Sequence, residues 1–347
     1  MKALLLTKYR SLEIAELALP VPGPGDVLIR VAACGICGSD VHGYDGSSGR
    51  RIPPLVMGHE AAGTIDTIGK DVKDFSQGER VTFDSTIYCN RCDYCARGDV
   101  NLCDHRKVLG VSCGDYRRAG AFAEFVVVPA RIVYRLPEAL SFAEGAMLEA
   151  VSVALHAVSL VPIASGSTSL VVGAGTIGLL LLQALRAAGC SQVFVSDLDS
   201  TRLELARKLG ATATFAAPEL PQQMLQATNG IGVDTAVEAV GINATVSAAI
   251  ESVRKGGNVV LVGNVSPEVT LPLQRVVTRQ IRLQGSCASA GEYPRAIELM
   301  SQGAIRVKPL ISAIAPLEKG PQWFERLYAR EPNLMKIVLA PGDYREQ

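Results

Sequence analysis

The chain has 347 residues, with 34 Lys and Arg against 34 Asp and Glu, and its formal net charge is +0. That balance argues against an electrostatic polyanion binder, which needs a basic excess. Hydrophobic residues make up 48% and charged residues 20%, so a large core can form and a mainly disordered chain is excluded. At this length we expect two domains, one of which can interrupt the other.

The N-terminal segment MKALLLTKYR holds an apolar patch too short for a secretory signal, and no small-residue cleavage site follows it. We therefore expect an unexported, cytoplasmic chain. The most apolar later stretch, 170–185, is broken by glycines, which predicts a buried strand, a turn and a helix instead of a membrane span. We expect the chain to bind a small-molecule substrate and to bind neither nucleic acid nor a membrane.

From residue 1 to about 133, short apolar alternations are separated by Gly and Pro, as in VLIRVAA and FAEFVVV. This pattern predicts an all-β domain with functional loops. From about residue 143 apolar strands alternate with helices, which is typical of a doubly wound parallel sheet. We expect helices over 177–188, 201–209, 244–254, 293–301 and 320–330, and we expect the tail after about 286 to pack back on the first domain.

A glycine-rich turn, Gly173-Ala174-Gly175-Thr176-Ile177-Gly178, follows the strand LVV and opens a helix, and Asp197 ends the next strand. Gly173 would permit the tight turn, Gly175 the approach of a pyrophosphate, and Gly178 close helix–strand packing. Asp197 would accept hydrogen bonds from a ribose diol and repel a 2′-phosphate, which predicts NAD over NADP. Arg202 could lie over the adenosine, although such an arginine is more often a solvated helix residue.

Cys89, Cys92, Cys95 and Cys103 form C-x2-C-x2-C-x7-C in a polar, loop-like segment at about 88–104. Four thiolates at this spacing can close a tetrahedral zinc shell with no open position, as in a structural site. Disulfides and an iron–sulfur cluster are the alternatives. Both fit less well, because the chain reads as unexported and no companion redox-cluster sequence is present.

Cys37 sits in a Gly-rich turn, and the pair His59-Glu60 lies in the segment GHEAAG. A thiolate, an imidazole and a carboxylate from separate loops are what an open catalytic zinc site requires. A buried structural cysteine and a surface histidine are the ordinary alternative, and spacing alone does not choose between them.

Together these segments resemble the zinc-dependent medium-chain alcohol and polyol dehydrogenases, closest to the sorbitol (L-iditol) and galactitol 1-phosphate group. The matching segments are CGICGSDVH, GHEAAGTIDTIG, the four-cysteine lobe, GAFAEFVVVP, GAGTIG and VSDLDSTRLELARKLGA. The resemblance implies a GroES-like zinc domain of 1–150 and 287–347 with a Rossmann NAD-binding domain of 151–286 between its parts. It places the active cleft between the two domains.

The same resemblance implies roles for single residues. Cys37 and His59 resemble the catalytic-zinc ligands, with Glu60 as a direct or exchangeable ligand. Glu149 is similar to the acidic residue of polyol dehydrogenases that binds zinc directly or through water. Ser39 and His42 resemble the proton relay, and Asp40 a partner that orients His59.

Several positions depart from that group. Gly43 stands where sorbitol dehydrogenases typically place a tyrosine, and the segment at 285–294 lacks their Arg-Tyr pair, so an altered substrate pocket is expected. Arg50 and Arg51 could bind the phosphate or carboxylate of a substrate, but we expect them to be two solvated loop charges. The same two alternatives apply to Arg117 and Arg118. Cys113 is expected to be an ordinary small side chain.

The expected activity is NAD-dependent oxidation of a secondary alcohol, namely a polyol, a sugar acid or a sugar phosphate, to the ketone. Oxidation of L-threonine or 2,3-butanediol is the neighbouring alternative, and a non-catalytic NAD-binding relative is a further one. The resemblance also implies a homodimer or homotetramer, to which the edge of the second sheet near 271–284 could contribute.

Overall fold

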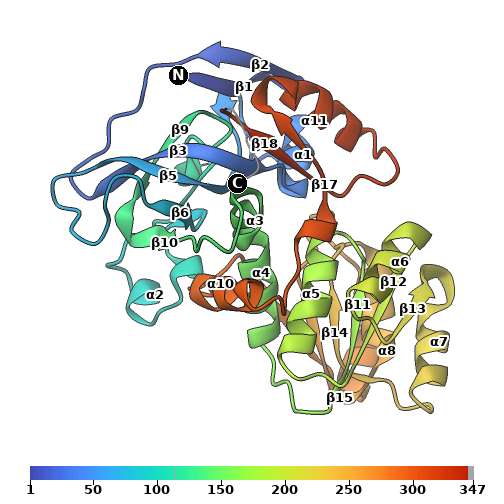
Figure 1. The fold of residues 1–347 in the computed structure, drawn as a ribbon. Coiled ribbons are helices and arrows are strands. Elements are labelled where there is room, and N and C mark those ends of the chain that lie inside the picture. Colours follow the sequence, from blue (N-terminus) through green and yellow to red (C-terminus); the bar gives the residue numbers. More distant parts are fainter. Residues whose placement is uncertain (113, 343–347) are drawn as a thin grey trace. The chain divides into compact units, whose positions relative to one another are not determined.

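The structure is a computed structural model that describes residues 1–112 and 114–342, so Cys113 lies outside the described residues. The chain divides into two compact units (Figure 1). Unit 1 comprises Met1–Glu149, Ser289–Ser301 and Val307–Gln347, and unit 2 comprises Ala150–Ala288 and Gln302–Arg306. No described helix combines the length and the apolar character that crossing a membrane requires.

Unit 1 is built around a mixed sheet with the strand order β10-β6-β5-β3-β18-β17, and β9 pairs with β3 beside this path. Its central strand β3 is buried along most of its length because it has neighbours on both sides. The strands are β3 (Asp26–Gly35), β5 (Glu60–Ile68), β6 (Arg80–Phe83), β9 (Phe125–Pro129), β10 (Val133–Arg135), β17 (Ile311–Pro316) and β18 (Lys336–Ala340).

The C-terminal strands belong to this sheet, because β18 runs antiparallel to β3 with Val338 opposite Gly35 and Leu339 opposite Cys34. The expectation that the tail packs back on the first part of the chain is therefore confirmed. Two smaller sheets join β1 (Lys2–Lys8) to β2 (Ser11–Glu16) and β4 (Leu55–Val56), and β7 (Thr86–Ile87) to β8 (Lys107–Val108). The helices of unit 1 are α1 (Gly38–Tyr44), α2 (Asp93–Ala96), α3 (Phe142–Ala146), α10 (Tyr293–Ser301) and α11 (Gly320–Tyr328), and α4 (Leu148–Ser159) begins in it.

Unit 2 is a six-stranded parallel sheet with the order β13-β12-β11-β14-β15-β16. The order reverses between β11 and β14, which is the switch point of a doubly wound fold, so the predicted fold class is confirmed. The strands are β11 (Thr168–Val172), β12 (Gln192–Asp197), β13 (Ala213–Ala216), β14 (Val233–Glu238), β15 (Val253–Leu261) and β16 (Arg282–Gly285). The helices are α5 (Thr176–Ala187), α6 (Ser200–Lys208), α7 (Leu220–Ala227), α8 (Asn243–Ser252) and α9 (Leu273–Thr278).

The predicted helices match α5, α6, α10 and α11 to within about two residues at each end. The helix expected over 244–254 is too long by two residues, because Val253 already pairs with Val233 in the sheet. In unit 2 the short elements β13, α7 and α9 were not predicted. Sheet pairing and packing define them, and their local sequence patterns are weak.

Candidate metal centres and nucleotide loop

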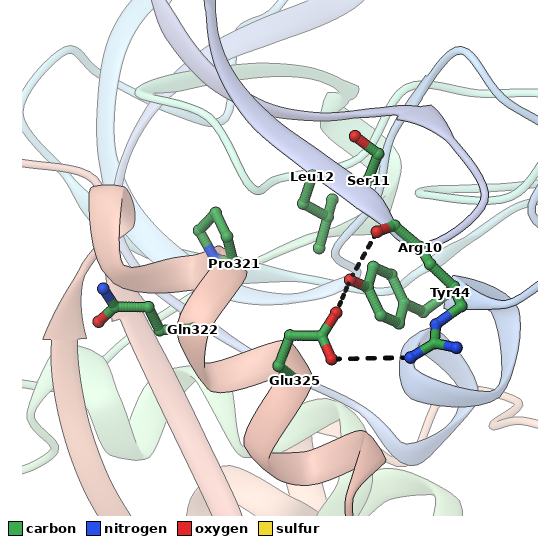
Figure 2. Close-up of a pocket in the computed structure, with 7 residues that line it drawn as sticks. All are labelled: Arg10, Ser11, Leu12, Tyr44, Pro321, Gln322 and Glu325. Carbon is green, nitrogen blue, oxygen red and sulfur yellow. Dashed lines mark hydrogen bonds and ion pairs between the residues drawn. The ribbon is translucent and has the colours of Figure 1, made fainter.

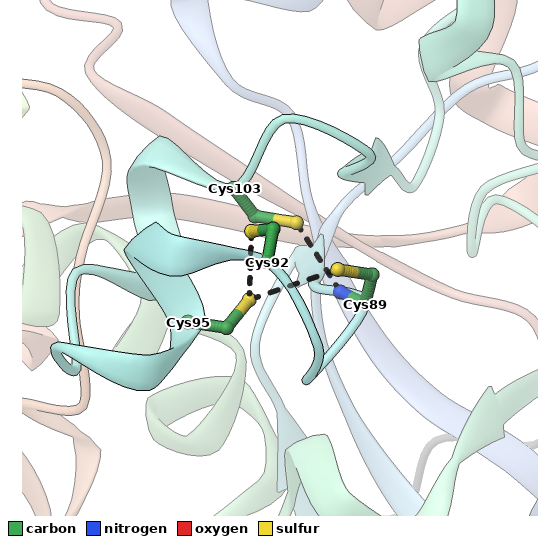
Figure 3. A group of neighbouring side chains, drawn as sticks. All are labelled: Cys89, Cys92, Cys95 and Cys103. Atoms are coloured by element: carbon green, nitrogen blue, oxygen red, sulfur yellow. Dashed lines mark hydrogen bonds between the residues drawn. The ribbon is translucent and has the colours of Figure 1, made fainter.

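The four cysteines of the lobe converge around α2 (Figure 3), with their sulfur atoms all within 4.8 Å of one another. Cys92 Sγ lies 3.5 Å from Cys95 Sγ, and Cys89 Sγ lies 3.9 Å from Cys95 Sγ. A tetrahedral ion with bonds of about 2.3 Å holds its sulfurs about 3.8 Å apart. The observed spacing therefore fits one zinc ion, whereas a disulfide needs sulfurs about 2.05 Å apart.

The electrostatics of the lobe favour a thiolate at Cys92, whereas burial raises the pKa of the Cys103 thiol to about 12. Backbone hydrogen bonding from Cys95, opposed by partial burial, lowers the pKa of the Cys92 thiol to about 6. The backbone N–H groups of Cys89 and His105 lie 3.2 and 3.4 Å from Cys103 Sγ. Such donors stabilise a ligated thiolate, since they share its negative charge. The lobe is a structural four-cysteine zinc site.

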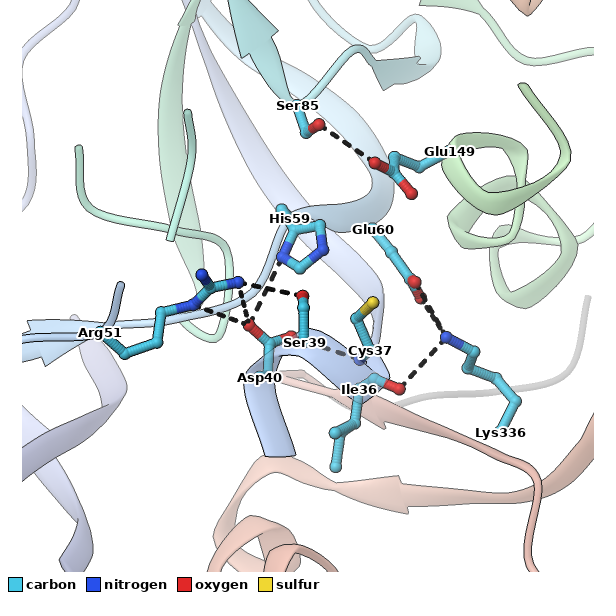
Figure 4. Close-up of polar contacts among 10 residues, drawn as sticks. All are labelled: Ile36, Cys37, Ser39, Asp40, Arg51, His59, Glu60, Ser85, Glu149 and Lys336. Carbon is cyan, nitrogen blue, oxygen red and sulfur yellow. Dashed lines mark hydrogen bonds and ion pairs between the residues drawn. The ribbon is translucent and has the colours of Figure 1, made fainter. Parts of the chain in front are cut away.

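A second cluster brings together Cys37, His59 and Glu60, whose ligand atoms also lie within 4.8 Å of one another. Cys37 precedes α1, while His59 and Glu60 stand at the start of β5 (Figure 4). His59 and Glu60 are buried. Three protein ligands leave one position for a water or a substrate, which distinguishes a catalytic zinc site from a structural one.

Asp40 lies beside His59, on the side of its Nδ1 atom, and is completely buried. Its Oδ1 is 3.5 Å from His59 Nδ1, an atom that has no hydrogen-bond partner of good geometry, and its Oδ2 accepts from the Cys37 backbone N–H at 3.2 Å. Because Nδ1 faces this carboxylate, His59 can offer Nε2 to a metal. Burial opposes ionisation of Asp40, but His59 and then Arg51 outweigh it and lower the pKa of this carboxyl to about 2.

Arg51 is buried, with 4% of its side chain exposed. Its Nη2 donates to Asp40 Oδ1 and to Ser39 Oγ, both at 3.1 Å. The expectation that Arg50 and Arg51 are both solvated is therefore wrong for Arg51, although Arg50 is exposed. A buried guanidinium requires a charged partner, and Asp40 supplies it. Arg117 is exposed and donates to the Pro54 carbonyl.

Lys336, the first residue of β18, was missed by the sequence analysis. Its Nζ lies 2.6 and 2.9 Å from the two carboxylate oxygens of Glu60 and donates to the Ile36 carbonyl at 3.1 Å. The side chains of Lys336 and Glu60 are 4% and 1% exposed. A lysine at the head of the apolar run KIVLA was the available signal, because a lysine in a buried strand needs a carboxylate partner.

Glu149, at the start of α4, is not within the Cys37–His59–Glu60 cluster. Its Oε1 accepts a hydrogen bond from Ser85 Oγ at 3.1 Å (Figure 4). Burial raises the pKa of Glu149, and the neighbouring His59 opposes that shift. Its assignment to the metal stays a prediction.

Two buried ion pairs flank this cluster, Asp40 with Arg51 and Glu60 with Lys336. Cys37 and Glu149 stand outside these pairs, and a bound cation would favour the ionised form of each. The donor set of thiolate, imidazole and carboxylate suits zinc.

Asp84 is a buried acid beside this region that the sequence analysis did not single out. It accepts from the Thr86 N–H at 2.8 Å and from Ser289 Oγ at 3.4 Å. Burial raises its pKa to about 7, against the lowering effect of the Thr86 hydrogen bond. This carboxyl therefore changes charge near neutral pH.

The proposed relay residues Ser39 and His42 both lie on α1 and are both exposed. They are three residues apart, so their side chains share one face of the helix. The far end of α1 is held by Tyr44, whose hydroxyl lies 2.9 Å from the Arg10 carbonyl and 2.5 Å from Glu325 Oε1.

Tyr44 and Glu325 line a hollow of about 300 Å³ (Figure 2). Its walls are formed by Arg10, Ser11, Leu12, Tyr44, Pro321, Gln322 and Glu325. Within it Arg10 also forms an ion pair with Glu325 at 3.9 Å. These contacts fasten α1 to α11, and thereby fix the helix that carries Ser39, Asp40 and His42.

In unit 2 the glycine-rich turn links β11 to α5. Gly173 has φ of +101°, and a Cβ on Gly178 would collide with the Gly173 carbonyl oxygen, as expected for a tight turn and close packing. A Cβ on Gly175 would meet nothing within 4 Å, so this position leaves room beside the α5 N-terminus. The backbone N–H groups of Thr176 and Ile177 have no partner within the helix, and such groups suit a pyrophosphate.

Asp197 stands at the end of β12, as predicted. Its carboxylate accepts hydrogen bonds from the Ala174 N–H at 2.6 Å and from the Asp199 N–H at 2.9 Å. It is therefore fastened to the glycine-rich turn. Arg202 pairs with Asp199 at 3.7 Å and is partly exposed; the structure gives it no further role.

Two family models match the chain. A model described as "Alcohol dehydrogenase GroES-like domain" covers residues 23–138, and one described as "Zinc-binding dehydrogenase" covers residues 176–302. The chain is 34% identical to a sorbitol dehydrogenase of Bacillus subtilis (strain 168), with 99% of this chain and 98% of the relative aligned. It is 36% identical to an L-idonate 5-dehydrogenase of Vitis vinifera, covering 88% and 85% of the two chains.

Solved structures are similar along nearly the whole chain. Galactitol-1-phosphate dehydrogenase from Escherichia coli has a TM-score of 0.91 at 28% identity, with 98% of this chain and 100% of that one covered. An alcohol dehydrogenase from E. coli CFT073 complexed with NADH has a TM-score of 0.90 at 30% identity, covering 98% and 99%. A putative zinc-binding dehydrogenase from Sinorhizobium meliloti 1021 bound to NADP has a TM-score of 0.88 at 33% identity, with the same coverage.

Proposed function

The chain belongs to the zinc-containing medium-chain alcohol dehydrogenase family, and from that premise we propose that it oxidises a polyol, sugar acid or sugar phosphate to the ketone with NAD+. Its relatives place it among the zinc-dependent oxidoreductases of the polyol and sugar dehydrogenase type. The single observation that supports catalysis in this chain is the open cluster of Cys37, His59 and Glu60. We propose 1–150 with 287–347 as the zinc domain and 151–286 as the NAD-binding domain.

Cys37 and His59 would hold the catalytic zinc, and Glu60 would be a direct or exchangeable third ligand. Glu149 would join directly or through a water molecule. When bound, zinc supplies a Lewis acid that lowers the pKa of an alcohol hydroxyl, and NAD+ supplies the hydride acceptor. Lys336 contacts both carboxylate oxygens of Glu60, so it restrains this side chain whether Glu60 is a direct or an exchangeable ligand.

The proton of the substrate hydroxyl would leave along α1. Ser39 Oγ accepts it and passes its own proton to His42, which is exposed and releases it to water. Meanwhile Asp40 keeps Nδ1 of His59 facing away from the cluster. The helix thus carries both the relay and the residue that orients a ligand.

The cofactor would lie with its pyrophosphate at Gly173, Gly175 and Gly178 and the first turn of α5, including Thr176 and Ile177. Similar structures contain NADH in one case and NADP in another, so the shared fold does not select between them. The negative charge of Asp197 at the end of β12 favours the unphosphorylated ribose. We therefore propose NAD, with Arg202 flanking the adenosine.

A substrate panel tests this function. NAD reduction is followed at 340 nm with polyols, sugar acids, sugar phosphates, L-threonine and 2,3-butanediol, and the same series is run with NADP as the control. We expect turnover on one polyol-type class, with NAD preferred. Turnover restricted to threonine or butanediol, or none on any compound with both zinc sites filled, would contradict the proposal.

We further propose that the chain forms a homodimer or homotetramer. The edge strand β16 is preceded by α9, on which Leu273 and Val277 are 66% and 68% exposed. Exposed apolar residues beside an unpaired strand edge are typical of an interface. A monomer in light scattering at micromolar concentration would refute this.

A further inference from the structure

Arg51 is a charged residue of the site that belongs neither to the zinc ligand set nor to the relay. It comes from the loop before β4, yet its guanidinium reaches two residues of α1 (Figure 4). Nη2 donates to Ser39 Oγ and to Asp40 Oδ1, both at 3.1 Å, and Nε lies 3.4 Å from the same carboxylate oxygen. The Arg51 side chain is only 4% exposed, although arginine side chains are normally solvated.

Gly43 provides the space for this side chain. A Cβ on Gly43 would collide with Cγ of Arg51 and would lie 2.8 Å from its Cβ and 3.3 Å from its Cδ. The φ of Gly43 is not positive, so the absence of a side chain here serves packing and not an unusual backbone conformation. The absence of a side chain at Gly43 is therefore what leaves room for the stem of Arg51.

We propose that Arg51 is a positioning residue that fixes both the ligand side and the relay side of the Cys37–His59–Glu60 site, and that Gly43 is the residue that admits it. Asp40 connects Arg51 to two ligands, since its Oδ1 faces His59 Nδ1 and its Oδ2 accepts from the Cys37 N–H. On the relay side Arg51 donates to Ser39 Oγ. Only this relay part rests on the proposed function.

The geometry explains why an arginine is needed. Asp40 is fully buried and needs a positive partner besides the histidine that it orients. A planar guanidinium can bond Asp40 and Ser39 together with donors in fixed directions. A lysine could neutralise Asp40, but it lacks the rigid planar fork of donors and has no counterpart of Nε, which lies 3.4 Å from the same Asp40 oxygen.

Zinc release measures the ligand side without any substrate. Arg51→Met, Arg51→Lys and the control Arg50→Met, which changes the exposed neighbour, are each mixed with a chelating dye. We expect Arg51→Met to release the catalytic zinc roughly 10–100-fold faster than the parent chain, as for other outer partners of metal ligands. Arg51→Lys should release zinc at a rate between those of Arg51→Met and the parent chain, and Arg50→Met should release it at the parent rate. The zinc of the four-cysteine lobe should be retained in every variant.

Cobalt substitution supplies a spectroscopic readout of the same site. The visible absorption of Co²⁺ reports the geometry of its ligands, and we expect a changed band in Arg51→Met and none in Arg50→Met. On the relay side we expect kcat to fall more than KM rises, because Ser39 Oγ acts on the proton and not on initial binding. A chain without activity on any tested alcohol would refute the proposed function while leaving the zinc and cobalt readouts of Arg51 intact.

Gly43→Ala tests the steric half of the inference. The new methyl group should displace Arg51 and reproduce faster zinc release. Adding Arg51→Ala should cost less than the sum of the two single changes, because the colliding Cγ is gone and only the Cβ at 2.8 Å remains. This variant keeps the test open if Arg51→Met does not fold. Parent-like zinc release and cobalt spectra in Arg51→Met, or fully additive effects of Gly43→Ala and Arg51→Ala, would overturn the proposal.

Discussion

The two metal centres of unit 1 are built in opposite ways. The four-cysteine lobe takes all its ligands from one short segment, Cys89 to Cys103, and its second contacts are backbone N–H groups of that segment. The open site takes its ligands from the residue before α1 and from the start of β5, and depends on Arg51 and on Lys336, which is 276 residues from Glu60 in sequence. A local site can be read from spacing, whereas a site assembled by the fold cannot.

This difference has an energetic consequence. In the lobe the metal holds together a segment with few buried side chains, so metal binding contributes to folding. In the open site the sheet and α1 already hold the ligands, and the buried ion pairs fix their directions. We therefore expect loss of the first metal to affect stability and loss of the second to affect turnover.

The largest expected effect is that of Cys37→Ala on turnover. Losing this ligand should remove one zinc ion, and with it several kcal/mol of stabilisation of the developing negative charge, or about 10³-fold in kcat. Zinc content and NAD reduction on the same sample measure both. A fold close to the parent chain by circular dichroism is expected, and unchanged turnover would contradict the assignment of this site.

Cys95→Ser tests the four-cysteine lobe. We expect loss of the lobe zinc and a destabilisation of about 3 kcal/mol, since a structural ion contributes folding energy directly. Thermal unfolding followed by circular dichroism gives the change. If Cys95→Ser kept both zinc ions and the parent melting temperature, the lobe would not be a structural metal site.

Asp84→Asn tests the role of a buried acid near the open site. With its pKa raised to about 7, folded Asp84 keeps a proton that the unfolded chain loses above about pH 4. Its contribution is therefore favourable at low pH and is lost progressively as the pH rises to about 7. Asn stays neutral, so the variant should gain up to about 4 kcal/mol over the parent chain at pH 8.

Urea unfolding at pH 5 and pH 8 measures this difference. The exposed Asp71 provides the matched control, since Asp71→Asn should leave the pH dependence of stability unchanged. Equal pH dependence in the parent chain and Asp84→Asn would show that Asp84 is ionised in the folded protein at both pH values.

The smallest effect concerns the glycine-rich turn, which resembles the lobe in being a local motif. Asp197→Asn removes the charge and leaves one amide oxygen, which can accept from either the Ala174 or the Asp199 N–H group but not from both. We expect the preference for NAD over NADP to fall about tenfold, which corresponds to about 1.4 kcal/mol. Ratios of kcat/KM for the two cofactors give the result, and an unchanged ratio would remove Asp197 from cofactor selection.

The sequence predicted the doubly wound sheet, the four-cysteine lobe and the glycine-rich turn because each follows from local spacing or periodicity. It did not predict Lys336 as the partner of Glu60, because that contact exists only once β18 lies beside β3. Arg51 was expected in solvent for the same reason. A charged loop residue is normally solvated, and only the fold of this chain places Asp40 and Ser39 within its reach.

The structure gives a packing reason for Gly43, a position at which the sequence departs from the family pattern. From the sequence it was only a missing tyrosine and a sign of an altered pocket. In the structure the stem of Arg51 fills the space where a side chain at position 43 would lie. The missing side chain at position 43 and the buried arginine thus fit together in this chain.

Selective metal removal tests the central claim, that a closed structural zinc and an open catalytic zinc coexist in unit 1. Zinc per chain and NAD-dependent turnover are measured together during titration with a chelator such as 1,10-phenanthroline. We predict two zinc ions per chain, in keeping with the two ligand clusters. The zinc of the open site should be released first, and all turnover should be lost with it. The zinc of the four-cysteine lobe should be retained for as long as the chain stays folded. Full turnover after release of the first ion would contradict the account.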